Sequence, residues 1–197
     1  MFSQSFIALD LETTGLEPEK DEIINIALVR FENGSISASL DLMVKPQKEL
    51  SSFVNYLTGF SQNDLNDAKS FKELAPEILE FINGQPLVAH NASFDSRIFT
   101  LALNRNGFKN CEFTFWDSLV MAQAAWPFES HKLVNLVKFL NIEVSASHRA
   151  LPDAEACGKV FLFALSELEK CETSVYENLQ KVAAGTIYEP LFKREEK

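Results

Sequence analysis

Short apolar stretches separated by polar turns make up the first part of the chain. Residues 6–11 are apolar except for one acid, and residues 23–31 are rich in Ile and Val, so each is predicted to be a buried strand. Asn33-Gly34 comes next, a dipeptide typical of a two-residue hairpin turn, and residues 36–44 alternate loosely between apolar and polar positions. The pattern therefore predicts an antiparallel meander of three strands.

Helical spacing of apolar residues replaces this pattern from residue 70 onward. Ser70 and Glu73 fit a capping box, and the helix that they begin is predicted to end at Asn83-Gly84. Further elements are expected in this order: a strand at 86–89, a helix at 94–107, a strand at 113–116, and helices at 119–125, 133–140 and 152–165. Strands followed by helices that alternate with short strands predict an α/β fold, with helices packed against a mixed sheet.

The length of 197 residues favours one domain with a short appendage. We expect the domain to cover residues 1–170, because the apolar pattern weakens beyond it, and residues 171–197 to form a C-terminal appendage. Hydrophobic residues make up 46% of the chain, which is enough for a substantial core and excludes a wholly disordered protein.

The net charge of −10 argues against broad binding to a nucleic-acid backbone, which needs a basic face. It leaves open an enzyme that holds one strand end through divalent cations, since these attract phosphate to an acidic site. No apolar run approaches the roughly 18 residues that span a bilayer, and residues 1–10 lack the basic start of a signal peptide. The three cysteines form no Cys-x-x-Cys pair, so we expect a cytoplasmic protein that does not bind membranes.

Asp10 and Glu12 are the first candidates for chemistry. Alternate residues of a strand point to the same face, so both carboxylates share one face while Leu9 and Leu11 point into the core. Two adjacent carboxylates repel each other unless a cation lies between them, and their hard oxygen atoms suit Mg²⁺ or Mn²⁺. A solvated strand edge is the alternative interpretation.

Two further segments carry an acid at the predicted start of a helix. Asp95 follows the turn His90-Asn91, and Asp153 follows Pro152, which suits a first helical turn. His148 precedes the second of these helices, and its ordinary pKa of ~6.5 suits a general base at neutral pH. Taken one at a time, the acids are also explained as first-turn residues that favour the helix dipole, and His148 as an ordinary surface residue.

The order of these motifs is more specific than any one of them. Asp-x-Glu at 10–12, His-Asn-x-x-Phe-Asp at 90–95 and His-x-x-x-x-Asp at 148–153 together resemble the DEDDh, or DnaQ-like, 3′–5′ exonuclease family. The likeness is greatest to the epsilon proofreading subunit of bacterial DNA polymerase III, and it covers roughly residues 6–165. One departure is Leu57-Thr58-Gly59-Phe60, which stands where relatives often carry a His-Gly-Ile turn.

The resemblance implies an RNase H-like fold, in which a central mixed five-stranded sheet flanked by helices carries the first motif. It implies that Asp10 bridges two divalent metal ions, Mg²⁺ or Mn²⁺, that Glu12 and Asp153 complete the first metal site, and that Asp95 supports the second. His148 would accept the proton of the attacking water. Substrate contacts are expected from Thr13, Thr14, Gly15, Leu16, His90, Asn91 and Phe94. For Leu16 and Phe94, plain core packing is an equal alternative.

We therefore expect a 3′–5′ exonuclease that releases nucleoside 5′-monophosphates from single-stranded DNA ends in proofreading or repair, with a DNA polymerase catalytic subunit as a candidate partner. An exoribonuclease that trims RNA 3′ ends and a non-catalytic nucleic-acid-binding module are the alternatives. The segment Tyr188-Glu-Pro-Leu-Phe192 loosely resembles a sliding-clamp motif, but the leading Gln is missing, so we do not expect clamp binding.

Overall fold

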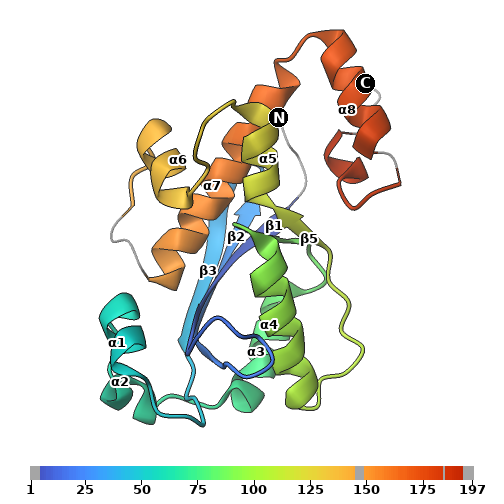
Figure 1. The fold of residues 1–197 in the computed structure, drawn as a ribbon. Coiled ribbons are helices and arrows are strands. Elements are labelled where there is room, and N and C mark those ends of the chain that lie inside the picture. Colours follow the sequence, from blue (N-terminus) through green and yellow to red (C-terminus); the bar gives the residue numbers. More distant parts are fainter. Residues whose placement is uncertain (1–4, 145–148, 184, 193–197) are drawn as a thin grey trace.

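The computed structural model describes residues 5–144, 149–183 and 185–192. Its centre is a five-stranded mixed sheet with the strand order β3-β2-β1-β4-β5 (Figure 1). Strands β1 (Phe6–Thr13), β2 (Ile23–Glu32) and β3 (Ser35–Met43) pair antiparallel, which confirms the predicted meander. Strand β4 (Leu87–Ala89) pairs in parallel with β1, and β5 (Phe115–Asp117) pairs in parallel with β4. The predicted mixed sheet is therefore confirmed, with β1 in the middle.

The hairpin and the capping box form as their residues predict. Asn33 and Gly34 both have positive φ angles, 52° and 79°, as a two-residue turn between twisted strands requires. Helix α3 (Phe71–Ile82) begins at Ser70, whose backbone N–H and hydroxyl both donate to the Glu73 carboxylate. It ends at Asn83 in the left-handed conformation.

Helices cover both faces of the sheet, and strands β1 and β2 contribute alternating side chains to both layers. On one face, Phe6 and Ala8 of β1 join a core with helices α5 (Ser118–Ala125) and α7 (Ala150–Glu169). On the other face, Ile7 and Leu9 pack with α3 and α4 (Ala92–Arg105). Figure 1 shows α4 and α7 on opposite sides of the strands.

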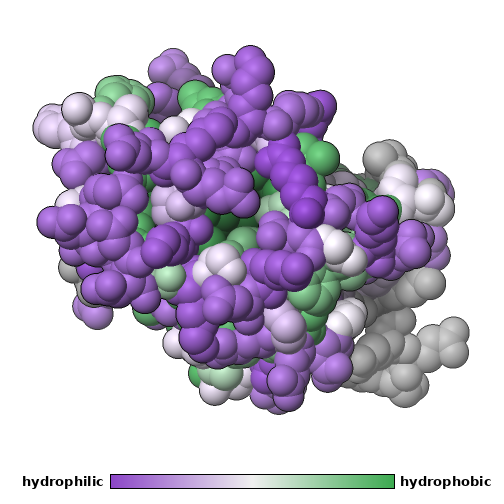
Figure 2. Space-filling view, turned by 90° about the horizontal axis from the view of Figure 1, so that it is seen from below, coloured by the Kyte–Doolittle hydropathy of each residue, from purple (hydrophilic) through white to green (hydrophobic). Residues whose placement is uncertain are grey.

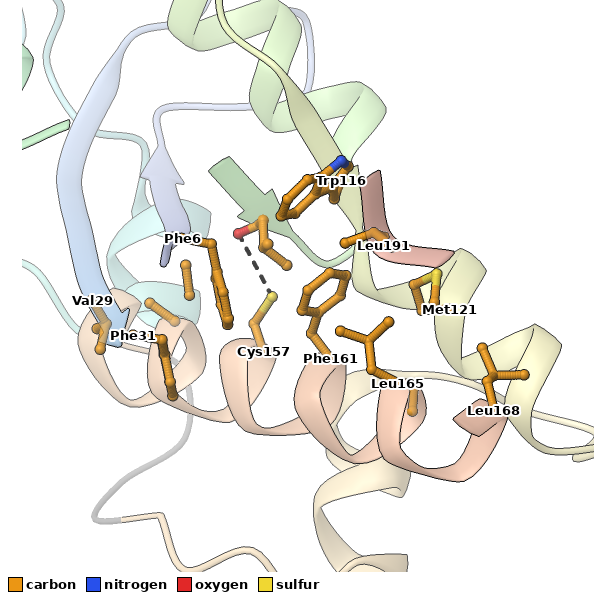
Figure 3. Close-up of a cluster of buried hydrophobic side chains, with 14 of the residues drawn as sticks. Phe6, Val29, Phe31, Trp116, Met121, Cys157, Phe161, Leu165, Leu168 and Leu191 are labelled. Carbon is orange, nitrogen blue, oxygen red and sulfur yellow. Dashed lines mark hydrogen bonds between the residues drawn. The ribbon is translucent and has the colours of Figure 1, made fainter. Parts of the chain in front are cut away.

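Helix α7 crosses the sheet at very short range. A Cβ atom on Gly158 would lie 2.2 Å from the Phe31 ring, so only glycine fits at this point. Figure 3 shows Cys157 and Phe161 of the same helix pointing toward the sheet. The Cys157 thiol donates to the Val88 carbonyl oxygen at 3.8 Å. This close packing fixes the start of α7, where Asp153 lies, relative to the central strands.

The segment that follows β3 contains two short helices that the sequence pattern did not predict, α1 (Ser52–Thr58) and α2 (Gln62–Asn66). Each begins at a serine, Ser51 or Ser61, whose hydroxyl accepts a backbone N–H of the first turn. Helices this short show no clear apolar period, and local caps define them instead. Helix α6 (Leu133–Phe139) formed within its predicted range.

The C-terminal segment packs onto the main core. Helix α8 (Thr173–Ala183) and the 3₁₀ helix η1 (Glu189–Phe192) contribute Tyr176, Leu191 and Phe192 to the cluster that contains Phe161. Leu191 and Phe192 are both buried there. The boundary between domain and appendage stays a prediction. None of the described helices is both long and apolar enough to cross a bilayer.

Candidate metal centre

Asp10 and Glu12 lie side by side near the end of β1. They project from the same face as Phe6 and Ala8, which pack beneath α7, and Leu9 and Leu11 are buried on the other face. The regular pairing with β2 shifts between Glu12 and Thr13, so the strand becomes irregular directly after the second acid. The two carboxylates therefore share one face near the end of β1, as the alternation predicted.

Asp153 joins them from the other half of the chain. It lies in the first turn of α7, and a carboxylate oxygen from each of Asp10, Glu12 and Asp153 lies within 4.8 Å of the other two. Among the residues that the structure describes, these three are the acidic, histidine or cysteine side chains that lie close enough together to hold one metal ion. Two segments more than 140 residues apart in sequence thus meet at one point.

These acids are electrostatically strained without a cation. Burial raises the pKa of Asp10 well above its usual value, and the charges of Asp95, Asp153 and Glu12 raise it further. Burial and the Asp153 charge raise the pKa of Glu12 to about 7. A divalent cation would relieve this repulsion, and a set of carboxylate oxygens suits Mg²⁺ or Mn²⁺ rather than a soft metal. The donor set present here therefore fits the expected ions.

Asp95 lies close to the group without being part of it. It is in the first turn of α4 and is only 8% exposed. Burial raises its pKa to about 7, a backbone hydrogen bond lowers it, and the charges of Asp117 and Glu12 raise it. Since Asp95 in turn raises the pKa of Asp10, the acids expected at the site share one electrostatic environment. His148 falls outside the described residues, so its expected role stays a prediction.

The loop after β1 is held by its own side chains. The Asp21 carboxylate accepts hydrogen bonds from the Thr14 hydroxyl at 3.0 Å and from the Glu17 backbone N–H at 2.8 Å. A Cβ on Gly15 would lie 2.4 Å from that carboxylate, so glycine is needed there. The Thr13 hydroxyl donates to the Gly15 carbonyl oxygen at 2.6 Å. Asp21 was not predicted to take part in the site, because its partners become visible only in the fold.

Leu16 is presented to solvent on this braced loop. Its side chain is 84% exposed, so core packing is the wrong interpretation for Leu16. Figure 2 looks from below at the end of the molecule toward which β1 runs, where mostly hydrophilic side chains surround a hollow with an apolar floor. Phe94 differs, because it is partly buried against the core formed with α3 and α4.

His90 and Asn91 form the turn that begins α4. The Nδ1 atom of His90 lies 2.8 Å from the Ser118 hydroxyl, and its Nε2 atom lies 2.8 Å from the His131 carbonyl oxygen. Both ring nitrogens are thus engaged within the protein, and a substrate contact by His90 would use its carbon atoms. Asn91 is left-handed, with φ 66°. His131 is itself held in place, since its Nε2 lies 2.9 Å from the Trp126 carbonyl oxygen.

Comparison with known proteins identifies the family. The exonuclease family model RNase_T matches residues 7–161. The DNA polymerase III PolC-type protein of Thermotoga petrophila is 34% identical over 189 residues, which are 94% of this chain and 14% of that protein. The 3′-5′ exonuclease DinG of Bacillus subtilis is 32% identical over 189 residues, which are 95% of this chain and 20% of DinG. The chain thus spans a fifth or less of these relatives, and its special likeness to the epsilon subunit stays a prediction.

Solved structures share the fold. Exonuclease X in complex with 5′ overhanging duplex DNA superimposes with a TM-score of 0.68 at 22% identity, over 82% of this chain and 91% of that one. The nuclease domain of 3′hExo, a DEDDh family member bound to rAMP, gives a TM-score of 0.71 at 19% identity, over 87% and 95% of the two chains. The sheet order and flanking helices are therefore those of RNase H-like exonucleases, as predicted. Since the family model covers most of its length and its motifs lie in this fold, the chain belongs to the RNase_T exonuclease family and is of the DEDDh type.

Proposed function

We propose that this protein is a metal-dependent 3′–5′ exonuclease that releases nucleoside 5′-monophosphates from single-stranded DNA ends. One observation carries the proposal: Asp10, Glu12 and Asp153 bring carboxylate oxygens within 4.8 Å of one another in a chain of the exonuclease family. Acids at this spacing repel one another, and a pair of divalent cations would offset that repulsion. A non-catalytic module would carry the same unfavourable repulsion without gaining an activity from it.

The acids divide the work of holding the ions. Asp10 would bridge two of them, Glu12 and Asp153 would complete one site, and Asp95 would support the other. Divalent ions held by these acids would supply positive charge for the oxygen that attacks and the oxygen that leaves in a displacement at phosphorus. The rigid placement of Asp10 and Glu12 on the central strand keeps their oxygens in position without further ordering. His148 would take the proton of the attacking water.

We propose that the loop after β1 binds the end of the DNA strand. Leu16 is exposed while the loop around it is braced by Asp21 and Gly15, so an apolar side chain is held in solvent on the loop that follows the strand of Asp10 and Glu12. Such a side chain suits contact with the face of a terminal base, which tolerates any sequence. Two relatives, the PolC-type DNA polymerase III and the exonuclease DinG, support a role in proofreading or repair. We propose a polymerase catalytic subunit as the partner.

A single-stranded DNA oligomer with a 5′ label tests the proposal. Incubation with Mg²⁺ or Mn²⁺ should give a ladder of products that shorten one nucleotide at a time, whereas cleavage from the 5′ end would release the label at once. EDTA should stop the reaction, and excess Mg²⁺ should restore it. Asp10→Asn should be inactive, and Glu32→Gln, which changes an exposed acid at the end of β2, should match the wild type. Activity that persists in EDTA, or in Asp10→Asn, would refute the proposal.

Trimming of RNA ends is the second candidate. It is favoured by one observation, that the structurally similar 3′hExo domain is bound to rAMP. RNA and DNA differ at the 2′-hydroxyl, so the two substrates can be separated by rate. Matched DNA and RNA oligomers of one sequence, compared by kcat/KM, decide between them: a preference for RNA of tenfold or more would assign the chain to RNA processing.

A further inference from the structure

Asp117 joins three parts of the fold through one carboxylate. It is the last residue of β5 and the N-cap of α5, and it accepts the Leu119 backbone N–H at 2.9 Å as such a cap does. It also accepts the backbone N–H groups of Asn91 at 3.0 Å and Ala92 at 2.9 Å. An N-cap serves its own helix, so the last two bonds have a second purpose: they hold the start of α4 from a strand 25 residues away.

Asp95 depends on where α4 starts. It lies three residues after Ala92, within the same helical turn, and its side chain is buried. The turn itself lacks a cap of its own, because the Asn91 side chain at the helix N-cap makes no capping hydrogen bond.

The position of Asp117 is fixed in turn by residues on either side of it. The Trp116 indole N–H donates to the Ile187 carbonyl oxygen at 2.7 Å. The Ser118 hydroxyl lies 2.8 Å from Nδ1 of His90, a second tie between the same two segments. A continuous set of hydrogen bonds therefore runs from the C-terminal segment through β5 to the turn that carries Asp95.

We propose that Asp117 is a positioning residue for the acid site: its carboxylate fixes the start of α4 and thereby places Asp95 for ion binding. The inference rests on the proposed function, because it assigns Asp95 to a metal site. Asp117 acts through Asp95 and contacts neither the ion nor the substrate. Residues that orient metal ligands in this way typically change metal affinity by about 10–100-fold when they are altered.

Asp117→Ser separates the two tasks of this side chain. A serine hydroxyl is as good an N-cap as aspartate, so α5 keeps its cap, but its single oxygen cannot also serve Asn91 and Ala92. Mn²⁺ affinity, measured by the EPR signal of the free ion, should weaken about 10–100-fold. Asp117→Asn, which keeps one acceptor oxygen, should give a smaller loss and serves if the serine variant does not fold. Glu73→Gln is the matched control, because it removes a helix-capping acid from α3 and should bind Mn²⁺ like the wild type.

A double-mutant comparison shows whether Asp117 acts through Asp95. In an Asp95→Asn background, Asp117→Ser should change the Mn²⁺ affinity by less than about twofold, since the group that it positions is gone. The same loss with and without Asp95, or no loss in either background, would overturn the inference while leaving the proposed function intact. A wild-type protein that neither binds Mn²⁺ nor degrades DNA would instead refute the proposed function itself.

Discussion

Replacing Asp95 by Asn should stabilise the metal-free protein while it impairs ion binding. Asp95 is a buried acid whose pKa is raised from 3.8 to about 7, chiefly by burial. Its charged form is therefore unfavourable in the folded state and unhindered in the unfolded chain. Asparagine has nearly the same shape and carries no charge, so the substitution removes that penalty without leaving a cavity.

The magnitude follows from the pKa of Asp95. One pKa unit corresponds to about 1.36 kcal/mol, so the rise from 3.8 to about 7 costs the folded protein roughly 4 kcal/mol once Asp95 is ionised. We expect roughly 2–4 kcal/mol to be recovered, because relaxation and water reduce such penalties. For a chain of this length about 1 kcal/mol shifts the Tm by about 2–4 °C, so the gain should be several degrees.

The sign of the pH dependence is fixed by the direction of the pKa change. An acid with a raised pKa binds its proton more tightly when folded, so its penalty is absent at pH 4 and grows as the pH rises toward 7. Thermal melts in EDTA should therefore show equal Tm values for Asp95→Asn and wild type near pH 4, and the full difference at pH 8. Mg²⁺ should raise the Tm of the wild type more than that of the variant.

Asp64→Asn is the matched control, because Asp64 is also a first-turn acid but is exposed. The hydrogen bonds from Ser61 lower the pKa of Asp64, so the same substitution there should destabilise the protein at pH 8 rather than stabilise it. If Asp95→Asn lowers the Tm in EDTA at pH 8, or raises it equally at pH 4 and pH 8, the reasoning about buried acids in this site is wrong.

Three further substitutions probe other parts of the molecule. Asp10→Ala should abolish turnover in the oligomer assay and leave the circular dichroism spectrum unchanged, because it removes the shared ion ligand and relieves repulsion. His148→Ala should lower kcat by about 10²–10⁴-fold, the usual contribution of a general base, and a loss under threefold would remove His148 from that role. Gly158→Ala should destabilise the fold by about 1–3 kcal/mol in urea titrations, because its methyl group would overlap the Phe31 ring; unchanged stability would show that α7 can shift away from the sheet.

The parts of the fold that were predicted from sequence are those set by neighbouring residues. Alternation along β1 places Asp10 and Glu12 on one face wherever the strand lies. Asn33-Gly34 and the pair Ser70 and Glu73 define a turn and a helix start by local hydrogen bonds and φ angles. These features depend on a few adjacent residues, so the sequence alone was sufficient to predict them.

Apart from the two short, locally capped helices α1 and α2, the parts that escaped prediction are set by distant contacts. Helix α4 begins at Ala92 rather than at residue 94, and α7 at Ala150 rather than at Pro152. In α4 the earlier start follows from Asp117, whose carboxylate accepts the backbone N–H groups of Asn91 and Ala92 from a distant strand. The burial of Leu191 in the main core is likewise a property of the folded chain, since the tail has no strong apolar period.

The cost of the acid site explains why its ligands come from helix starts as well as from a strand. Asp95 and Asp153 each lie in a first helical turn, where the dipole favours a negative charge by about 0.3–1 kcal/mol. That is far below the roughly 4 kcal/mol by which burial and neighbouring charges disfavour ionised Asp95. Backbone dipoles therefore offset only part of the repulsion between the carboxylates, and a bound cation would offset the rest. We expect a site built in this way to bind divalent ions strongly, because the fold leaves its carboxylates uncompensated. Substitutions that make the metal-free protein more stable should therefore make its metal binding weaker.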